Sequence, residues 1–488
     1  MTLSRLHSFY YFLLYSNFSY PTMKKITSLF LLFFVFQFAY SQEIIGQWNG
    51  VLKVPGGQLR LVFNVSETEN GYSSTMDSPD QGAKGIPTTS TSFEDGVLKI
   101  TIANARIEYQ GTLGEDNKIV GTFTQAGQSF PMDLSREIVQ KEVPKRPQEP
   151  QKPFPYYSED IKFDNAKAGI TLAGTLTLPE EKGNFPAVVL ITGSGPQNRD
   201  EEILGHKPFL VISDYLTRNG IAVLRFDDRG TAASGGNFGT ATSNDFATDV
   251  QAAVEFLKTR KEINKDKIGL IGHSEGGLIA PIVAKDSPDI AFLVLLAGTG
   301  IPGGDILLLQ QRLIGASSGM TPAQLDENEK MSSKTFEIVR NAASDEDLKR
   351  ELAGLMIQTF RSMPADQVPE GLTEGDFVNA QMKQLTSPWM INFIKYDPAP
   401  TLEKIKIPVL AINGSNDLQV PPKENLGAIK AALEKAGNED FTIQELPGLN
   451  HLFQESSTGA ISEYETIEQT FSPDALELIL KWIQSKVN

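Results

Sequence analysis

The chain has 488 residues, of which 40% are hydrophobic and 21% are charged, a composition typical of a globular protein with room for two or three domains. Its formal net charge of −16 at pH 7 gives it no electrostatic affinity for nucleic acid or for anionic lipid. The sequence contains no cysteine, which excludes disulfides, thiolate metal sites and cysteine nucleophiles.

Residues 1–41 have the pattern of an export signal. A basic start at Met23-Lys24-Lys25 precedes a mostly apolar stretch, 26–38, and Ala39-Tyr40-Ser41 offers the small residues that a signal peptidase recognises. We expect translation to start at Met23 and the mature protein to be periplasmic or extracellular, without stable membrane insertion. A longer, membrane-anchored leader is the alternative, although the apolar stretch is short for a membrane span.

Residues 43–136 are predicted to form a small antiparallel β-barrel or β-sandwich. Apolar and polar residues alternate along 59–65, 98–102 and 119–123, and turn sequences separate these segments without an intervening helical period. The opening Gly46-Gln47-Trp48 is similar to the Gly-x-Trp start of lipocalin-like barrels. We expect Trp48 to fill the core of this domain rather than to contact a ligand.

A proline-rich linker, 137–157, follows the β domain. Prolines recur at every third position from Pro144 to Pro153, between lysine, glutamine and glutamate residues. Because polyproline II has about three residues per turn, these prolines would share one edge of a stiff, solvated spacer. This composition predicts a domain boundary.

Residues 158–488 alternate between apolar strands and amphipathic helices, which predicts an α/β domain with a doubly wound, mostly parallel sheet. An initial hairpin at 160–163 and 170–178 is expected to precede the strands Ala187–Thr192, Ala222–Phe226, Ile268–Ile271, Ala291–Ala297, Val409–Asn413 and Thr442–Leu446. The polar, helix-like segment at about 301–397 would lie over the carboxyl edge of this sheet, where ligands bind, and is predicted to be a helical lid.

A serine nucleophile is indicated by Gly272-His273-Ser274-Glu275-Gly276, directly after the apolar run 268–271. A strand that ends in Gly-x-Ser-x-Gly and turns into a helix holds the serine in a tight bend with its hydroxyl exposed. The alternative interpretation is a plain glycine-rich turn. A serine nucleophile also needs a base, and the chain has only four histidines.

The position of His451 favours it as this base. His7 lies in the leader, and His273 is too close to the serine in the bend to accept its proton. His206, early in the second domain, fits a structural role better. His451 follows the last predicted strand, at the edge of the sheet from which Ser274 emerges.

A base of this kind needs a carboxylate to fix its tautomer and to stabilise the imidazolium. Asp417 directly follows strand Val409–Asn413 and comes between Ser274 and His451 in the chain, which is the order that this architecture uses. An ordinary turn role for Asp417 is one alternative. Asp397 is a second, weaker candidate for the partner of the histidine.

Taken together, these motifs resemble the α/β-hydrolase superfamily, in particular bacterial serine esterases. The resemblance covers about 158–488 and rests on short sequences that occur in order at strand ends: 191–196, 226–230, 272–276, 414–417 and 450–451. It does not extend to residues 43–136. It implies a catalytic triad of Ser274, Asp417 and His451.

The resemblance also implies an oxyanion hole. One donor would be the backbone N–H of Glu275, where a helix begins. The other would be the N–H of Ser194, with Gly195 as the alternative, because Thr192-Gly193 stands where the family commonly has His-Gly. The Glu275 side chain is not needed for this chemistry, and we expect it to be solvated or to face the lid.

The function implied is cleavage of carboxylic esters of small molecules through an acyl-enzyme, with no cofactor. A peptidase, a thioesterase and an acyltransferase are alternatives on the same triad, and a glycan- or partner-binding protein on a hydrolase scaffold is an alternative of another class. A zinc site is not expected, because only His206 and His451 remain as histidine ligands, too few for most zinc sites, and the sequence contains no His-x-x-x-His. Candidate acyl-pocket residues in the lid are Phe360, Met363, Trp389 and Met390, although packing within the lid is the alternative for each.

Overall fold

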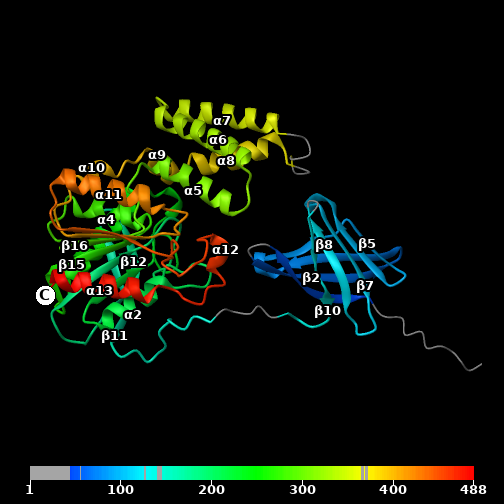
Figure 1. Cartoon of the computed structure of the whole chain (residues 1–488), viewed down its shortest axis with the longest axis horizontal. Coiled ribbons are helices and arrows are strands. Elements are labelled where there is room, and N and C mark those ends of the chain that lie inside the picture. The colour runs from blue at the N-terminus through cyan, green and yellow to red at the C-terminus, as the bar shows by residue number, and fades with distance from the viewer. Residues whose placement is uncertain are drawn as a thin grey trace, which may run out of the picture.

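The computed structural model describes residues 44–54, 57–125, 128–139, 145–363, 368 and 372–487. The predicted leader and Pro144 lie outside this range. Two bodies with separate hydrophobic cores follow one another along the chain, a β domain and a larger α/β domain (Figure 1). None of the helices in the described residues combines the length and apolar character needed to cross a bilayer.

The first domain is a closed antiparallel β-barrel. Eight strands form the ring, and the two-residue strand β10 closes it by pairing with both β1 and β8. The ring strands are β1 (Gly46–Val54), β2 (Gly57–Thr68), β3 (Gly71–Ser78), β5 (Ser90–Glu94), β6 (Val97–Ile102), β7 (Ile107–Leu113), β8 (Ile119–Gln125) and β10 (Leu134–Ser135). Strands β4 (Ala83–Pro87) and β9 (Gln128–Pro131) pair at its margin, and short 3₁₀ helices occur at Pro79–Gln81 and Ala103–Ala105. The expected β domain is confirmed, as a barrel.

Trp48 fills the interior of the barrel, as expected from the sequence. Its side chain is fully buried, and its indole Nε1 donates a hydrogen bond to the carbonyl of Ile44 at 2.7 Å. The Arg136 guanidinium lies 3.8 Å from the centre of the indole ring, which adds a cation–π contact. Phe63, Tyr109 and other buried apolar side chains pack in the same core.

The second domain is built on an eight-stranded sheet with the order β11-β12-β14-β13-β15-β16-β17-β18. Pairing is antiparallel from β11 to β14 and parallel from there on, which confirms the predicted hairpin and mostly parallel sheet. The strands are β11 (Tyr157–Asn165), β12 (Ile170–Leu178), β13 (Phe185–Ile191), β14 (Ala222–Phe226), β15 (Ile263–His273), β16 (Phe292–Leu296), β17 (Val409–Gly414) and β18 (Phe441–Leu446).

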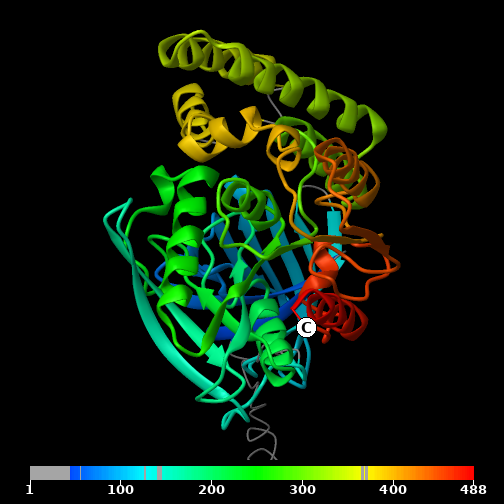
Figure 2. The ribbon, with the colours of Figure 1, turned by 90° about the vertical axis from the view of Figure 1, so that its left-hand side faces the viewer.

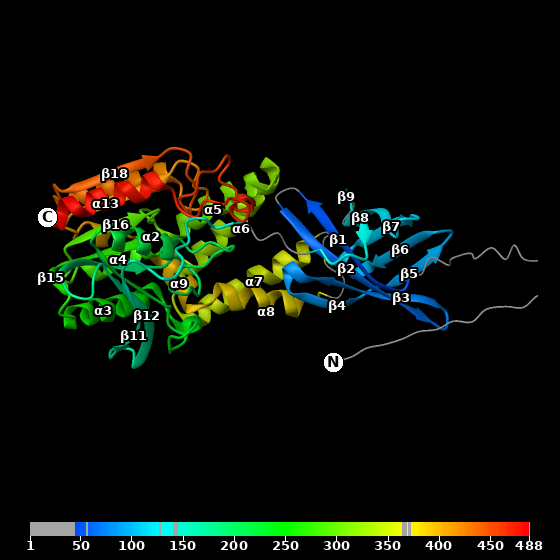
Figure 3. The same cartoon turned by 90° about the horizontal axis from the view of Figure 1, so that it is seen from below.

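Helices cover both faces of this sheet (Figures 1 and 3). Helices α2 (Pro208–Arg218) and α13 (Pro473–Val487) contact each other on one face. The other face is covered by α3 (Ser243–Thr259), α4 (Gly276–Ala284), α10 (Ala399–Leu402) and α11 (Pro422–Ala436). The short helices η3 (Phe238–Thr240) and α12 (Ile461–Tyr464) lie in loops. A continuous apolar core fills the space between sheet and helices.

The predicted lid is a helical insertion between β16 and β17. It consists of α5 (Gly303–Ser317), α6 (Pro322–Asn341), α7 (Asp345–Ser362), α8 (Glu374–Leu385) and α9 (Pro388–Lys395), with no strand among its described residues. The helices form a small core of their own around Phe336, Leu352 and Ile394. Figure 2 shows them stacked on one side of the domain, beyond the helices that pack on the sheet. The expected architecture of the second domain is thus confirmed.

The described part of the proline-rich linker is exposed or half-buried, as expected, but it is not a free spacer, because it binds the second domain. Arg146 donates hydrogen bonds to the carbonyls of Ile467 at 2.8 Å and Glu465 at 2.9 Å. Gln148 donates to the carbonyl of Phe471 at 2.6 Å and accepts from the amide of Thr470 at 2.6 Å. Polar side chains between the prolines therefore fasten this segment to the second domain.

Candidate active site

Ser274 occupies the tight bend that the sequence predicts between β15 and α4. Its φ of 53° is in the left-handed region, which is strained for a residue with a Cβ. The Ser274 amide is held by the carbonyl of Leu296 at 2.9 Å, on the neighbouring strand. A Cβ at Gly272 would collide with the carbonyl of Gly276, and a Cβ at Gly276 with that of Ile191. The two glycines of the motif are therefore required by close packing.

His451 and Asp417 form a buried hydrogen-bonded pair. The Nδ1 of His451 lies 2.8 Å from Oδ2 of Asp417, and the two residues come from the loops after β18 and β17. The other Asp417 oxygen accepts the backbone N–H groups of Gln419 and Val420, both at 2.8 Å. The carboxylate is thus fixed on both oxygens, and the arrangement leaves Nε2 of His451 as the ring nitrogen available for proton transfer.

One cavity brings the predicted site residues together. It has a volume of about 160 Å³, and its lining includes Ser274, His451, Ser194 and Glu275. The lid contributes Ile306, Leu307, Gln310, Trp389 and Phe393 to the same wall. Within the described chain, the backbone N–H groups of Ser194 and Glu275 donate to no other protein group, so both are free to bind an anionic oxygen.

The Glu275 side chain is not solvated, contrary to one of the two expectations. It is 2% exposed, its Oε1 accepts the hydroxyl of Ser243 at 2.6 Å, and it faces the lid through the indole Nε1 of Trp389 at 2.9 Å. Burial raises the pKa of Glu275 above its ordinary value, and the hydrogen bonds oppose that shift. Of the four lid residues suggested by the sequence, only Trp389 lines the cavity, while Met390 packs in the lid core and Phe360 packs on Phe377.

Glu201 is a site residue that sequence reasoning missed. It is 3% exposed and lines the cavity, and its Oε1 accepts the amide of Gly193 at 2.8 Å. The same oxygen lies 2.9 Å from Nδ1 of His273. It sits in the irregular loop after β13, where neither period nor motif distinguishes it from the acidic residues beside it.

The other candidates from the sequence have structural roles. His206 is fully buried, with ring nitrogens 3.1 Å from Oγ1 of Thr470 and 2.7 Å from the carbonyl of Tyr464. Asp397 is exposed and accepts the amide of Ala399, at the start of α10. Neither residue contacts Ser274 or the pair formed by His451 and Asp417.

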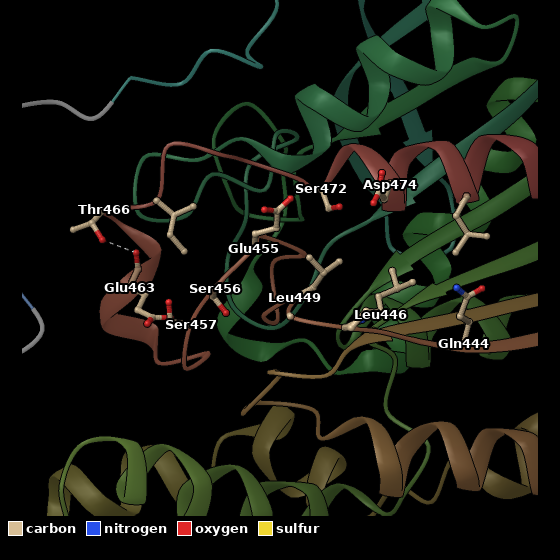
Figure 4. Close-up of a pocket in the computed structure, with 14 residues that line it drawn as sticks. Gln444, Leu446, Leu449, Glu455, Ser456, Ser457, Glu463, Thr466, Ser472 and Asp474 are labelled. Carbon is tan, nitrogen blue, oxygen red and sulfur yellow. Dashed lines mark hydrogen bonds between the residues drawn. The ribbon is translucent and has the colours of Figure 1, made fainter.

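A larger cavity, of about 900 Å³, lies beside β18, α12 and α13 and does not include the predicted site (Figure 4). Three acidic side chains, Glu455, Glu463 and Asp474, line it together with small hydroxyl residues. The Glu463 carboxylate is engaged by the backbone amides of Thr458 and Gly459, both at 3.2 Å. Its lining offers no serine paired with a histidine, so the smaller cavity is the candidate active site.

The described residues contain no cluster of three or more histidine, aspartate and glutamate side chains arranged to hold a metal ion. The Asp228-Arg229-Gly230 sequence is structural, because Arg229 forms a buried ion pair with Asp249 of α3, with 2.7 Å between Nε and Oδ2.

The chain is similar to a hydrolase family model and to several known proteins. Residues 209–391 match the family model described as serine aminopeptidase, S33, a segment that contains Ser274 and ends before Asp417 and His451. Esterase EstD of Thermotoga maritima is 28% identical over 300 residues, which are 61% of this chain and 62% of that protein.

A second relative, the uncharacterized protein PA2218 of Pseudomonas aeruginosa, is 34% identical over 130 residues, 26% of this chain and 33% of that protein. The chain thus spans less than two thirds of the length of either relative. The solved structure of the P. aeruginosa protein aligns with 72% of this chain and 99% of its own, with a TM-score of 0.41 and 18% identity.

Proposed function

We propose that this chain is a serine hydrolase of small carboxylic esters that uses the α/β-hydrolase fold of its second domain, with Ser274 as nucleophile, His451 as base and Asp417 as its orienting carboxylate. One observation carries the proposal: Ser274, in its left-handed bend, lines the same cavity as His451, which is bonded to Asp417. The name of the T. maritima relative, an esterase, supports the ester as the substrate class.

In the proposed reaction, Oγ of Ser274 attacks the ester carbonyl carbon while Nε2 of His451 takes the hydroxyl proton. The bond from Nδ1 to Asp417 fixes the tautomer and stabilises the imidazolium. The backbone N–H groups of Ser194 and Glu275 hold the carbonyl oxygen as it becomes negative, and each such donor is worth about 3 kcal/mol in the transition state.

Collapse of this intermediate breaks the ester C–O bond. The alcohol leaves with the proton from His451, and the acyl group stays on Ser274. A water molecule, deprotonated by His451, then attacks the acyl-enzyme. The carboxylic acid departs, and the proton returns to Ser274.

The cavity size favours short acyl groups. At about 160 Å³ it is comparable to an engineered protein cavity of about 150 Å³ that binds benzene. We expect p-nitrophenyl acetate and butyrate to be hydrolysed faster than the octanoate. The lid residues that close the cavity, Trp389 and Phe393 among them, would set this limit.

A fluorophosphonate probe tests the assignment, since it labels only a serine that a working base activates. We expect labelling of the wild type and none of the Ser274→Ala variant. An unlabelled wild type would reject the proposal and favour a binding protein on a hydrolase scaffold. A peptidase is the second candidate, because the matching family model is described as serine aminopeptidase. Faster hydrolysis of aminoacyl p-nitroanilides than of esters would favour it.

We also propose that the protein is exported and divided as the sequence suggests, with a leader at 1–41, a β domain at 43–136, a linker at 137–157 and a catalytic domain at 158–488. N-terminal sequencing of protein recovered from the periplasm or medium should begin at Gln42. An unprocessed N-terminus in a cytoplasmic fraction would contradict export.

A further inference from the structure

His273 has a hydrogen-bond acceptor at each ring nitrogen. Its Nδ1 lies 2.9 Å from Oε1 of Glu201, and its Nε2 lies 2.9 Å from the backbone carbonyl of His451. A neutral imidazole carries one N–H and can donate only one of these two bonds. Both bonds form together when the ring is an imidazolium and Glu201 is ionised.

The surroundings of His273 support this charged pair. Burial is the largest single influence and opposes a charged ring, but the Glu201 carboxylate, the carbonyl of His451 and the charge of Asp417 together outweigh it and raise the pKa of His273 above its ordinary value. The titratable groups around the ring are Glu201, His451 and Asp417. The apolar side chains of Phe453, Leu452 and others complete its environment.

The pair also connects two loops of the proposed site. The Glu201 oxygen that faces His273 accepts the amide of Gly193, which precedes the proposed oxyanion donor Ser194. A Cβ on Gly193 would lie 3.2 Å from Cβ of Ser274, so this loop passes directly beside the nucleophile. At the other end, His273 holds the backbone of His451 itself.

Glu201 is kept in this place despite two unfavourable features. Its φ of 51° is left-handed, and its second carboxylate oxygen is buried without a hydrogen-bond partner in the described structure. Both features destabilise the folded state. Such features cluster at functional sites, because a merely structural position could be filled by a residue without them.

We propose that Glu201 and His273 are positioning residues that act as one unit: they couple the oxyanion loop to the backbone of the base and place a positive charge beside its ring. The ring centres of His273 and His451 are 4.8 Å apart. The charged ring therefore packs directly against the ring of the base. This inference rests on the proposed triad.

The test compares Glu201→Gln, His273→Gln and the double variant with the wild type on p-nitrophenyl butyrate. A misplaced base or oxyanion loop lowers kcat by about 10- to 100-fold while KM changes little. His273→Gln should lower kcat to a similar extent as Glu201→Gln, since either substitution breaks the link between the two loops. Because the two residues act together, the double variant should lose no more activity than the worse single variant.

His206→Gln is the matched control, since it removes another buried histidine that bonds through both ring nitrogens but does not contact the triad. It should lower the unfolding temperature without lowering kcat. The positioning role is overturned if His273→Gln keeps wild-type kcat, or if His206→Gln lowers kcat equally while KM stays unchanged. Ser274→Ala tests the nucleophile alone. If this variant is inactive while His273→Gln is fully active, the proposed nucleophile stands and only the positioning role fails.

A measurement on the unaltered protein needs no variant to fold. The mature chain would hold three histidines, His206, His273 and His451, so their ¹⁵N ring signals can be resolved. We expect one ring, assigned to His273, to keep the imidazolium pattern to higher pH than a free imidazole does. A neutral His273 at pH 6 would overturn the charged pair.

Discussion

The indole Nε1 of Trp389 donates a hydrogen bond to Oε1 of Glu275, with 2.9 Å between the two atoms, and this contact joins the lid to the residue that follows the nucleophile. Ser243 of α3 donates to the same oxygen at 2.6 Å. Because Glu275 is buried, these donors are what stabilise its ionised form. The lid and the nucleophile turn thus share one buried polar contact.

Trp389→Phe keeps an aromatic ring in the lid and removes the donor. We expect the free energy of unfolding to fall by about 1–2 kcal/mol, because a buried acceptor loses a partner. Looser docking of the lid should raise KM for p-nitrophenyl butyrate by about 3- to 10-fold. Trp482→Phe is the control. Trp482 lies on α13, away from the cavity, and the substitution removes the hydrogen bond that its indole donates to Thr442 at 3.2 Å. Equal effects of both substitutions on KM would argue against docking through Glu275.

Ser274 should be required for activity and unfavourable for stability. Ser274→Ala is expected to lower kcat by about 10⁶-fold. Ser274→Gly should be equally inactive, yet more stable than the alanine variant by about 1 kcal/mol, because glycine relieves the left-handed φ of 53°. Urea denaturation of the two variants measures the difference. An alanine variant as stable as the glycine variant would mean that the bend holds no strain.

The sheet and the nucleophile turn were predictable because local chemistry determines them. Each parallel strand is a short apolar run, and the packing around Gly272 and Gly276 admits no side chain, so both leave a direct mark in the sequence. The order of the strands along the chain then placed Asp417 and His451 at one edge, where the structure has them bonded.

Other parts of the molecule depend on contacts between distant segments. Glu201 and His273 are in contact although 72 positions separate them in the chain. Glu201 also lies in a loop that has neither a hydrophobic period nor a recognisable motif. The barrel closes through β10, which has only two residues and therefore no alternation to detect. The prolines of the linker are visible in the sequence, but two of the carbonyl groups that accept hydrogen bonds from Arg146 are more than 300 positions away.

Asp228 should make stability depend on pH near neutrality. Burial raises its pKa to about 7, although Thr192 and the amide of Gln197 donate to its two oxygens. Above about pH 4 the unfolded chain releases this proton, whereas the folded protein keeps it up to about pH 7. The folded state then binds more protons, so this carboxyl makes the free energy of unfolding fall as pH rises from 4 to 7.

Asp228→Asn should remove that contribution, which is at most about 1.4 kcal/mol per pH unit, and give a flatter stability curve. Urea denaturation at pH 5, 6 and 7 checks the slope. Asp397→Asn is the control, because Asp397 is exposed and its substitution should leave the slope unchanged. An unaltered slope in the Asp228 variant would show that its carboxyl is already ionised at pH 5.

Arg146 should fasten the linker to the catalytic domain. Its guanidinium donates to four backbone carbonyls of that domain, those of Leu204, Gly205, Glu465 and Ile467. Arg146→Ala removes these bonds and should raise the rate of chymotrypsin cleavage at Tyr156 and Tyr157 by about 10-fold or more, because each 1.4 kcal/mol of lost local stability raises the open population tenfold. Lys145→Ala, an exposed neighbour, is the matched control. Cleavage as slow as in the wild type would mean that Gln148 and Tyr156 hold the segment without Arg146, since Gln148 bonds Phe471 and the Tyr156 hydroxyl donates to Asp214 at 2.9 Å.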